Sequence, residues 1–221
     1  MATMGRSVIL NLWKKNLGTV PNSVWDCAEL ESLILADNAL TELSESLGRL
    51  KQLRTLDLGH NQLTELPQSV GDLVEMSDFL YLQDNRFTTL PVSLGKLQKL
   101  RYLNISRNLI SVFPEPCCNL SSLIELDASD NKITILPANI ARLSRLRELR
   151  LRNNRLVTLP IEVSKLQELR LLDLRGNPLK SLPVGIADLP RLEKLDLRWV
   201  DSLPWLQWFG LLEARGCLVY R

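Results

Sequence analysis

Leucines and polar residues alternate along this chain in a frame that returns about every 23 residues. Each copy reads L-x-x-L-x-L-x-x-N-x-L-x-x-L-P, and seven copies carry an anchor asparagine at the ninth position. The anchors are Asn38, Asn61, Asn85, Asn108, Asn131, Asn154 and Asn177, at steps of 23 residues with a single step of 24. Lys15 and Val200 occupy the anchor position of a first and a last copy, which makes nine copies. The unbroken recurrence predicts one structural unit, repeated and stacked.

The two leucines on either side of one polar residue predict a short strand in each copy. In the stretch LRLRNNRL, alternation places Leu149 and Leu151 on the core side of the strand. Arg150 and Arg152 then lie on the opposite, outward side. One such strand cannot bury its apolar side alone, so stacked copies share a core and pair as a parallel sheet. The anchor, here Asn154, is expected to turn inward and hydrogen-bond to backbone groups of successive turns.

The remainder of each copy predicts a short helical segment. Apolar residues recur nine, twelve and fifteen positions after the anchor, as at Val163, Leu166 and Leu169. This three-residue spacing suits a short helix or a 3₁₀ segment. A proline precedes the segment in several copies and fixes φ at its start (Pro67, Pro91, Pro114, Pro137, Pro160 and Pro183). In the 24-residue step, MSDFLYLQDN, the extra residue predicts a bulge just before the strand.

The frame resembles the leucine-rich repeat family. Its L-x-x-L-P-x-x-[ILV]-x-x-L-x-x-L part is similar to the intracellular 23-residue class, which includes Ras-associated scaffolds, plant intracellular Ras-group proteins and bacterial repeat proteins. The resemblance covers residues 8–203. It implies an α/β solenoid, a horseshoe arc with a parallel sheet on the concave face and short helical or 3₁₀ segments on the convex face. We therefore expect a single domain over residues 1–221.

Both ends of such a stack need a cap, because an open end exposes apolar core. We expect a thin N-terminal cap over residues 1–7. The frame breaks after residue 203, where four apolar residues fall on one stripe of a helix: Trp205, Trp208, Phe209 and Leu212. Residues 203–221 are therefore predicted to form a capping helix, from Pro204 to Gly216, and a last strand over 217–220. Alternatively, these aromatic side chains bind a partner.

Composition fits one elongated domain. Hydrophobic residues make up 45% of the 221 residues, and a net charge of only +2 does not favour a nucleic-acid partner. No apolar run is long enough for a membrane span, and the start MATMGRSVILNLWKK lacks the regions of a secretory signal. Cysteine spacing fits neither zinc nor paired end clusters, so Cys27 and Cys117 are interpreted as buried thiols. We expect a cytoplasmic monomer without metal, cofactor or membrane insertion.

The outward residues of the strands are the candidates for function. Phe79, Tyr81 and Tyr102 fall on two adjacent strands, and aromatic residues are common interface anchors. They are predicted to bind a partner on the concave face. The alternative is a locally packed surface without a partner.

A second outward patch is rich in arginine. The predicted partner-binding set includes Arg150, Arg152, Arg155, Arg175 and Arg198, with Asp127, Asp173 and Asp196 in the column beside them. Arginine forks bind carboxylates or phosphates, while the alternative is an Arg–Asp network along the sheet. Residues 1–140 hold 12 Lys/Arg and 16 Asp/Glu, a net charge of −4, and the rest of the chain has +6. This asymmetry favours a partner of complementary charge.

The sequence gives little support for a catalytic function. The one histidine, His60, lies near Asp57 on the concave edge, and no plausible nucleophile shares its column. The glycines follow no phosphate-binding pattern. We therefore predict a non-catalytic protein–protein interaction module or scaffold. The family resemblance implies a role in signalling and partners such as small GTPases or phosphatases. The alternatives are a bacterial effector or host-interacting repeat protein, and an anionic-ligand or targeting subunit.

Overall fold

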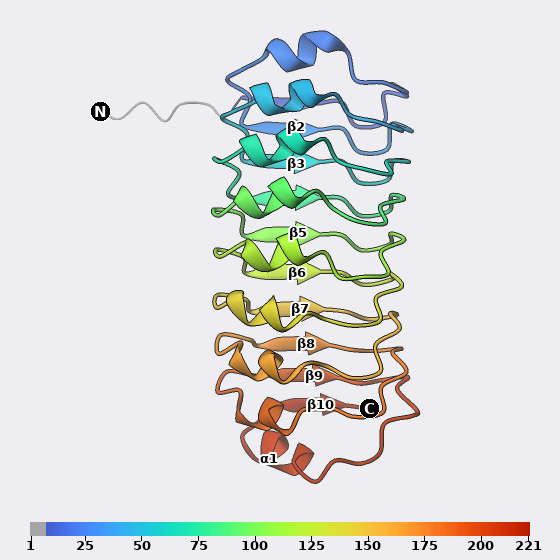
Figure 1. Ribbon diagram of the computed structural model, residues 1–221, viewed down its shortest axis with the longest axis vertical. Coiled ribbons are helices and arrows are strands. Elements are labelled where there is room, and N and C mark those ends of the chain that lie inside the picture. Colours follow the sequence, from blue (N-terminus) through green and yellow to red (C-terminus); the bar gives the residue numbers. More distant parts are fainter. Residues whose placement is uncertain (1–7) are drawn as a thin grey trace, which may run out of the picture.

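The computed structural model describes residues 8–221, and each turn of the chain adds one short strand to a single sheet (Figure 1). The strands are β1 (Ile9–Asn11), β2 (Ser32–Ile34), β3 (Thr55–Asp57), β4 (Phe79–Tyr81), β5 (Tyr102–Asn104), β6 (Glu125–Asp127), β7 (Glu148–Arg150), β8 (Leu171–Asp173), β9 (Lys194–Asp196) and β10 (Leu218–Tyr220). They pair in parallel and in chain order. The predicted solenoid with a parallel sheet is confirmed. The predicted cap over residues 1–7 lies outside the described residues.

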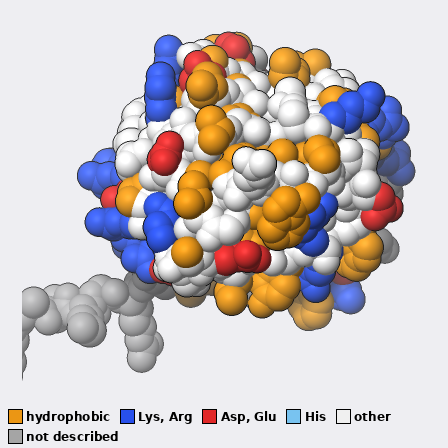
Figure 2. Space-filling model, turned by 90° about the horizontal axis from the view of Figure 1, so that it is seen from below, with side chains coloured by type: hydrophobic (Ala, Val, Ile, Leu, Met, Phe, Trp, Pro, Cys, Tyr) orange, Lys and Arg blue, Asp and Glu red, His pale blue; other side chains and the backbone are white. Residues whose placement is uncertain are grey.

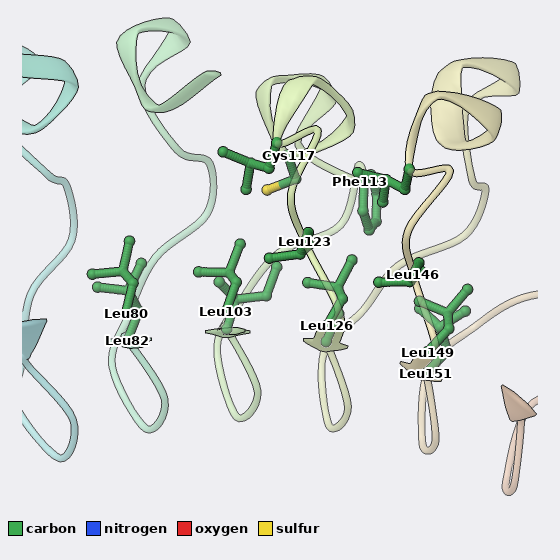
Figure 3. Packing of buried hydrophobic residues seen from close by; sticks show 14 of the residues in the cluster. Leu80, Leu82, Leu103, Phe113, Cys117, Leu123, Leu126, Leu146, Leu149 and Leu151 are labelled. Atoms are coloured by element: carbon green, nitrogen blue, oxygen red, sulfur yellow. The ribbon is translucent and has the colours of Figure 1, made fainter. Parts of the chain in front are cut away.

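Equivalent leucines of successive strands lie side by side in the core. Leu126 pairs with Leu103 on one side and with Leu149 on the other, and all three are fully buried. Figure 3 shows these side chains pointing from the strands toward Phe113 and Cys117 in the opposite wall of the turns. Each turn is therefore stabilised mainly by the turns before and after it.

The opposite side of each turn carries a 3₁₀ segment. These segments are η1 (Asn22–Asp26), η2 (Glu45–Arg49), η3 (Gln68–Asp72), η4 (Val92–Lys96), η5 (Glu115–Asn119), η6 (Ala138–Arg142), η7 (Ile161–Lys165) and η8 (Val184–Asp188). All but η2 follow a proline. In η2, Ser44 replaces it, and its hydroxyl accepts a hydrogen bond from the Ser46 amide at 3.1 Å. The segment therefore keeps a defined start without proline.

The extra residue of the 24-residue step lies ahead of β4. The Asp78 amide donates to the Arg54 carbonyl at 3.0 Å, and Phe79 then pairs with Thr55 in the common register. Ser77, between Met76 and this hydrogen bond, is the extra residue, and its hydroxyl accepts a hydrogen bond from Arg54 Nε at 3.1 Å. The insertion is absorbed before the strand, so the outward column of β4 is not shifted to the core side.

The residue before each anchor turns the chain inward with a positive φ. From the second turn on, these residues are Asp37, His60, Asp84, Arg107, Asp130, Asn153, Gly176 and Trp199, with φ between 52° and 64°. Asn, Asp and Gly tolerate this left-handed conformation, whereas a bulky side chain adopts it at a cost. The turn brings the following anchor residue into the core side of the solenoid.

The anchor asparagines tie neighbouring turns together. The amide nitrogen of Asn131 donates to the carbonyl of Ile105 in the previous turn at 2.9 Å, and to those of Ala128 and Ser129 in its own turn at 3.2 and 3.1 Å. Its oxygen accepts from the Ile110 amide at 3.1 Å. All seven asparagines are buried. Each one therefore satisfies backbone groups that the turn would otherwise leave unpaired.

The C-terminal helix is shorter than predicted. Helix α1 spans Phe209–Ala214, with Phe209 and Leu212 fully buried, and β10 follows it. The prediction that the helix begins at Pro204 is wrong. Residues 203–206 are not helical, and the carbonyl of Leu203 accepts a hydrogen bond from Arg221 Nη2 at 2.8 Å. Trp205, predicted on the buried stripe, is 59% exposed and lies 5.4 Å from the Arg221 guanidinium.

Candidate protein-binding face

The three outward aromatic residues form one cluster on the sheet, here called the aromatic cluster (Phe79, Tyr81 and Tyr102). The rings of Phe79 and Tyr81 are stacked with centroids 5.6 Å apart, and Tyr102 lies 5.5 and 5.2 Å from them. Phe79 is 42% exposed, and the two tyrosines are half-buried. The contacts among the rings hold them in place, so a ligand meets a surface with little freedom left to lose.

A shallow depression adjoins the aromatic cluster at the N-terminal ends of β4, β5 and β6. It has a volume of about 170 Å³ and is lined by Asp78, Phe79, Arg101, Tyr102, Ile124 and Glu125. Its walls combine aromatic and aliphatic surface with charged groups. Burial, followed by the nearby Asp127 carboxylate, raises the pKa of Tyr102, so its phenol stays protonated at neutral pH. The cluster thus offers apolar surface and hydroxyl groups together.

The outward arginines are largely neutralised within the sheet. Arg150 pairs with Glu148 on its own strand and with Glu125 at 3.6 Å on the previous strand. Arg152 pairs with Asp130 at 3.2 Å. These contacts match the alternative interpretation of the arginine patch, an ionic network along the sheet. Arg155 is exposed, and no ion pair holds it within residues 8–221.

Asp173 and Asp196 lie beneath arginines rather than at the surface. Asp173 is 4% exposed and receives hydrogen bonds from Arg175 Nε and Nη2 at 2.9 and 2.5 Å. Asp196 is fully buried and binds Arg198 in the same two-point way at 2.9 and 2.8 Å. The prediction that Asp173 and Asp196 present their carboxylates on the outward surface is therefore wrong. The guanidinium groups cover them, so these carboxylates orient the arginines.

The column that contains these aspartates has a local backbone role that sequence reasoning missed. The side-chain oxygen of Asp127 accepts a hydrogen bond from the Ser129 amide at 2.9 Å, and Asp57 binds the Gly59 amide in the same way. The signal was present, because Asn or Asp fills this position in six of nine copies: Asn11, Asp57, Asn104, Asp127, Asp173 and Asp196. Such short side chains stabilise the turn that ends the strand.

Sequence reasoning also missed an exposed aromatic group at the C-terminal end of the same face. Trp199 is 67% exposed, and Leu218 and Tyr220 on β10 are exposed beside β9. The available signal was the identity of Trp199, since the seven turns with an asparagine anchor carry Asp, His, Arg, Asn or Gly at the position before the anchor.

The histidine has a different acidic partner from the one predicted. His60 Nδ1 lies 2.7 Å from Asp84 Oδ2 of the next turn, and the Asp57 carboxylate instead binds a backbone amide. Both members of the His60–Asp84 pair are about half exposed. Within residues 8–221, no group of three or more His, Cys, Asp or Glu side chains is arranged to hold a metal ion. None of the described helices is long and apolar enough to cross a membrane.

The buried Asp196 carboxylate predicts a specific loss of stability in acid. Burial alone would raise the pKa of Asp196, but hydrogen bonds from the Arg198 side chain and backbone and from Lys194 outweigh it, and the pKa lies below its usual value. A carboxyl group with a lowered pKa in the folded state stabilises the fold above its ordinary pKa of about 3.9. That stabilisation is lost as the pH falls through the folded-state pKa.

Urea unfolding of the wild type and of Asp196→Asn between neutral pH and the acid range measures this effect. The stability difference between the two proteins is expected to be largest at neutral pH and to shrink in acid. Asp26→Asn serves as the control, because Asp26 is an exposed carboxylate paired with an exposed arginine. Parallel pH profiles for the wild type and Asp196→Asn would contradict the assignment.

Models of known families match most of these turns. The leucine rich repeat model matches residues 79–143 and 144–201, and the model for two copies of leucine rich repeats matches residues 28–70. The chain belongs to the leucine-rich repeat family. Among curated proteins, none matches the sequence.

Solved structures with the same fold superpose on most of the chain. A leucine-rich repeat protein of Leptospira interrogans has a TM-score of 0.71 at 26% identity, over 93% of this chain and 64% of that protein. Internalin C2 of Listeria monocytogenes has a TM-score of 0.74 at 24% identity, over 84% and 78% of the two chains, and shares the fold. The ectodomain of the Arabidopsis thaliana receptor kinase GASSHO1/SCHENGEN3 has a TM-score of 0.63 at 26% identity, over 89% and 29%.

Proposed function

We propose that this leucine-rich repeat chain is a non-catalytic interaction module that binds a protein partner on its concave face, with the aromatic cluster as the anchor. The observation that carries the proposal is the cluster itself. Three large rings gather on the outward side of β4 and β5, where the sheet needs no aromatic residue for its own packing. Aromatic side chains that are rigid and partly exposed dominate the energetics of many protein interfaces.

The dimensions of the arc support the same proposal. Ten strands at about 4.8 Å spacing give a face about 43 Å long, which accommodates a standard protein interface. Ion pairs within the sheet hold four outward arginines without any partner: Arg150, Arg152, Arg175 and Arg198. A preorganised surface loses little conformational entropy on binding. The similar plant ectodomain was solved in complex with CASPARIAN STRIP INTEGRITY FACTOR 2.

We further propose that the protein acts in the cytoplasm as a signalling scaffold. All four cysteines are free, and Cys117, Cys118 and Cys217 are buried. Burial raises the pKa of the Cys118 thiol to about 12, which keeps it protonated and unreactive. Unpaired, buried thiols fit a reducing compartment. A small GTPase or a phosphatase is the partner class that the family resemblance favours.

Affinity capture from extracts of the native cells tests the anchor. Tyr81→Ala/Tyr102→Ala is expected to lower retention of the partner at least tenfold, because two central aromatic contacts are lost. The matched control is Val92→Ser/Ile161→Ser, which changes two exposed residues of the opposite side, η4 and η7. Retention that falls with the control pair and not with the tyrosine pair would contradict the proposal.

A further inference from the structure

Trp199 combines backbone strain with exposure. Its φ of 61° lies in the left-handed region, which a tryptophan adopts only at a cost, and its side chain is 67% exposed. Glycine fills the same position one turn earlier, at Gly176. The fold therefore does not require an indole here. Figure 2 views the molecule from this C-terminal end, where hydrophobic side chains lie beside Lys and Arg side chains.

Cationic side chains surround this indole and the neighbouring Tyr220. The guanidinium carbons of Arg175 and Arg198 each lie 5.9 Å from the Trp199 ring. Arg198 also lies 5.4 Å from the Tyr220 ring, so it is close to both aromatic groups, and Lys194 Nζ is 5.0 Å from the Tyr220 ring. We call Arg175, Arg198, Trp199 and Tyr220 the arginine–tryptophan site.

Buried carboxylates hold the two arginines in one orientation. The Asp173 carboxylate accepts hydrogen bonds from Nε and Nη2 of Arg175, and the Asp196 carboxylate accepts them from the same two atoms of Arg198. This two-point contact leaves the Nη1 groups of both guanidiniums for a ligand. The Arg175 and Arg198 side chains are 20% and 41% exposed, whereas those of Asp173 and Asp196 are only 6% and 1% exposed, so a ligand reaches the cations and not the anions.

The charge balance indicates what kind of anion fits. Arg175, Arg198 and Lys194 contribute three positive charges, and Asp173 and Asp196 contribute two negative charges. Asp130 also acts on Arg175, but it is paired with Arg152 at 3.2 Å, so one positive charge of this partly buried group remains uncompensated. A single carboxylate neutralises it, whereas a doubly charged phosphate leaves an excess negative charge over two buried aspartates.

We propose that the arginine–tryptophan site binds an acidic side chain of the protein partner, with a neighbouring apolar side chain packed on Trp199. This inference rests on the proposed function and adds the partner's chemistry. Four strand spacings separate β5, in the aromatic cluster, from β9, beside this site, which is about 19 Å. An extended segment covers that span with about six residues. The partner segment thus carries an apolar residue at one end and an acidic–apolar pair at the other.

Nuclear magnetic resonance titration of the full chain with two capped dipeptides tests the site. The probes are acetyl-Glu-Leu-amide and acetyl-Gln-Leu-amide, and the reporters are the Trp199 indole N–H and the Tyr220 backbone amide. The glutamate probe is expected to shift both signals with an affinity about tenfold higher than that of the glutamine probe. Equal shifts with both probes would overturn the proposed site. The absence of any shift at about 20 mM probe, a concentration at which millimolar binding is detected, would overturn it as well.

Two variants complete the test. Trp199→Gly removes the indole and relieves the strained φ, so it is expected to unfold at the same or a higher temperature and to lose the Tyr220 shift. A folded Trp199→Gly that keeps the full shift would refute the role of the indole. Tyr81→Ala, in the aromatic cluster, is expected to leave the titration unchanged. Loss of the shifts in Tyr81→Ala would assign the probe to the aromatic cluster, which removes this inference without removing the proposed function.

Discussion

Replacing Asn131 by alanine is expected to lower the free energy of unfolding by about 3 kcal/mol or more, since each buried group left unpaired costs about 1–3 kcal/mol. The amide of Asn131 donates to carbonyls in two turns and accepts from the Ile110 amide, and the side chain is only 8% exposed. Alanine removes both the donors and the acceptor and supplies nothing in their place. The loss acts on the centre of the stack, where two neighbouring turns depend on it.

Urea unfolding followed by circular dichroism measures this loss, and an exposed asparagine provides the control. Asn119→Ala removes an amide that binds only the exposed Arg142 side chain in the structure, and its effect is expected to stay within about 0.5 kcal/mol. Similar effects for Asn131→Ala and Asn119→Ala would show that the anchor amide contributes no more than a surface amide.

The substitution Leu126→Ala is expected to cost about 3 kcal/mol, within the range of about 2–5 kcal/mol for truncating a buried leucine. Leu126 is fully buried between Leu103 and Leu149, in the row of leucines that Figure 3 shows. The cavity opens between three stacked strands, whose spacing the backbone hydrogen bonds fix. The surrounding turns therefore cannot close around it without breaking the sheet register.

Thermal and urea unfolding of Leu126→Ala, compared with Val112→Ala, check this second prediction. Val112 is 67% exposed, so its truncation is expected to change the free energy of unfolding by less than about 0.5 kcal/mol. A cost for Leu126→Ala as small as that of Val112→Ala would contradict the shared core on which the account of the fold rests.

The repeating frame predicts most of the fold because it carries two periods at once. The alternation at Leu149 and Leu151 sets the strand, and the three-residue spacing at Val163, Leu166 and Leu169 sets the convex segment. Neither depends on distant side chains. Even the extra residue near Ser77 is predictable, since a shift inside the strand would turn its leucines outward. These features are local consequences of backbone geometry and burial.

The parts that sequence reasoning missed depend on contacts between turns or with the end of the chain. Alternation along the strand predicts that Asp173 and Asp196 point outward, but the side chains of Arg175 and Arg198 cover them. At the C-terminal end, the Arg221 side chain donates a hydrogen bond to the Leu203 carbonyl ahead of α1, a contact between residues 18 positions apart. A one-dimensional pattern gives the side of the sheet on which a residue lies. It does not give the neighbour that covers it.

Site-specific photo-crosslinking in the native cells tests most directly whether a partner binds the concave face. A benzophenone amino acid at position 81, in the aromatic cluster, is compared with the same residue at position 92, which is 81% exposed on the opposite side. Binding on the concave face predicts a covalent adduct with a partner protein from position 81 and none from position 92. An adduct from position 92 alone would show that the partner binds the convex side, and the concave-face proposal would be wrong.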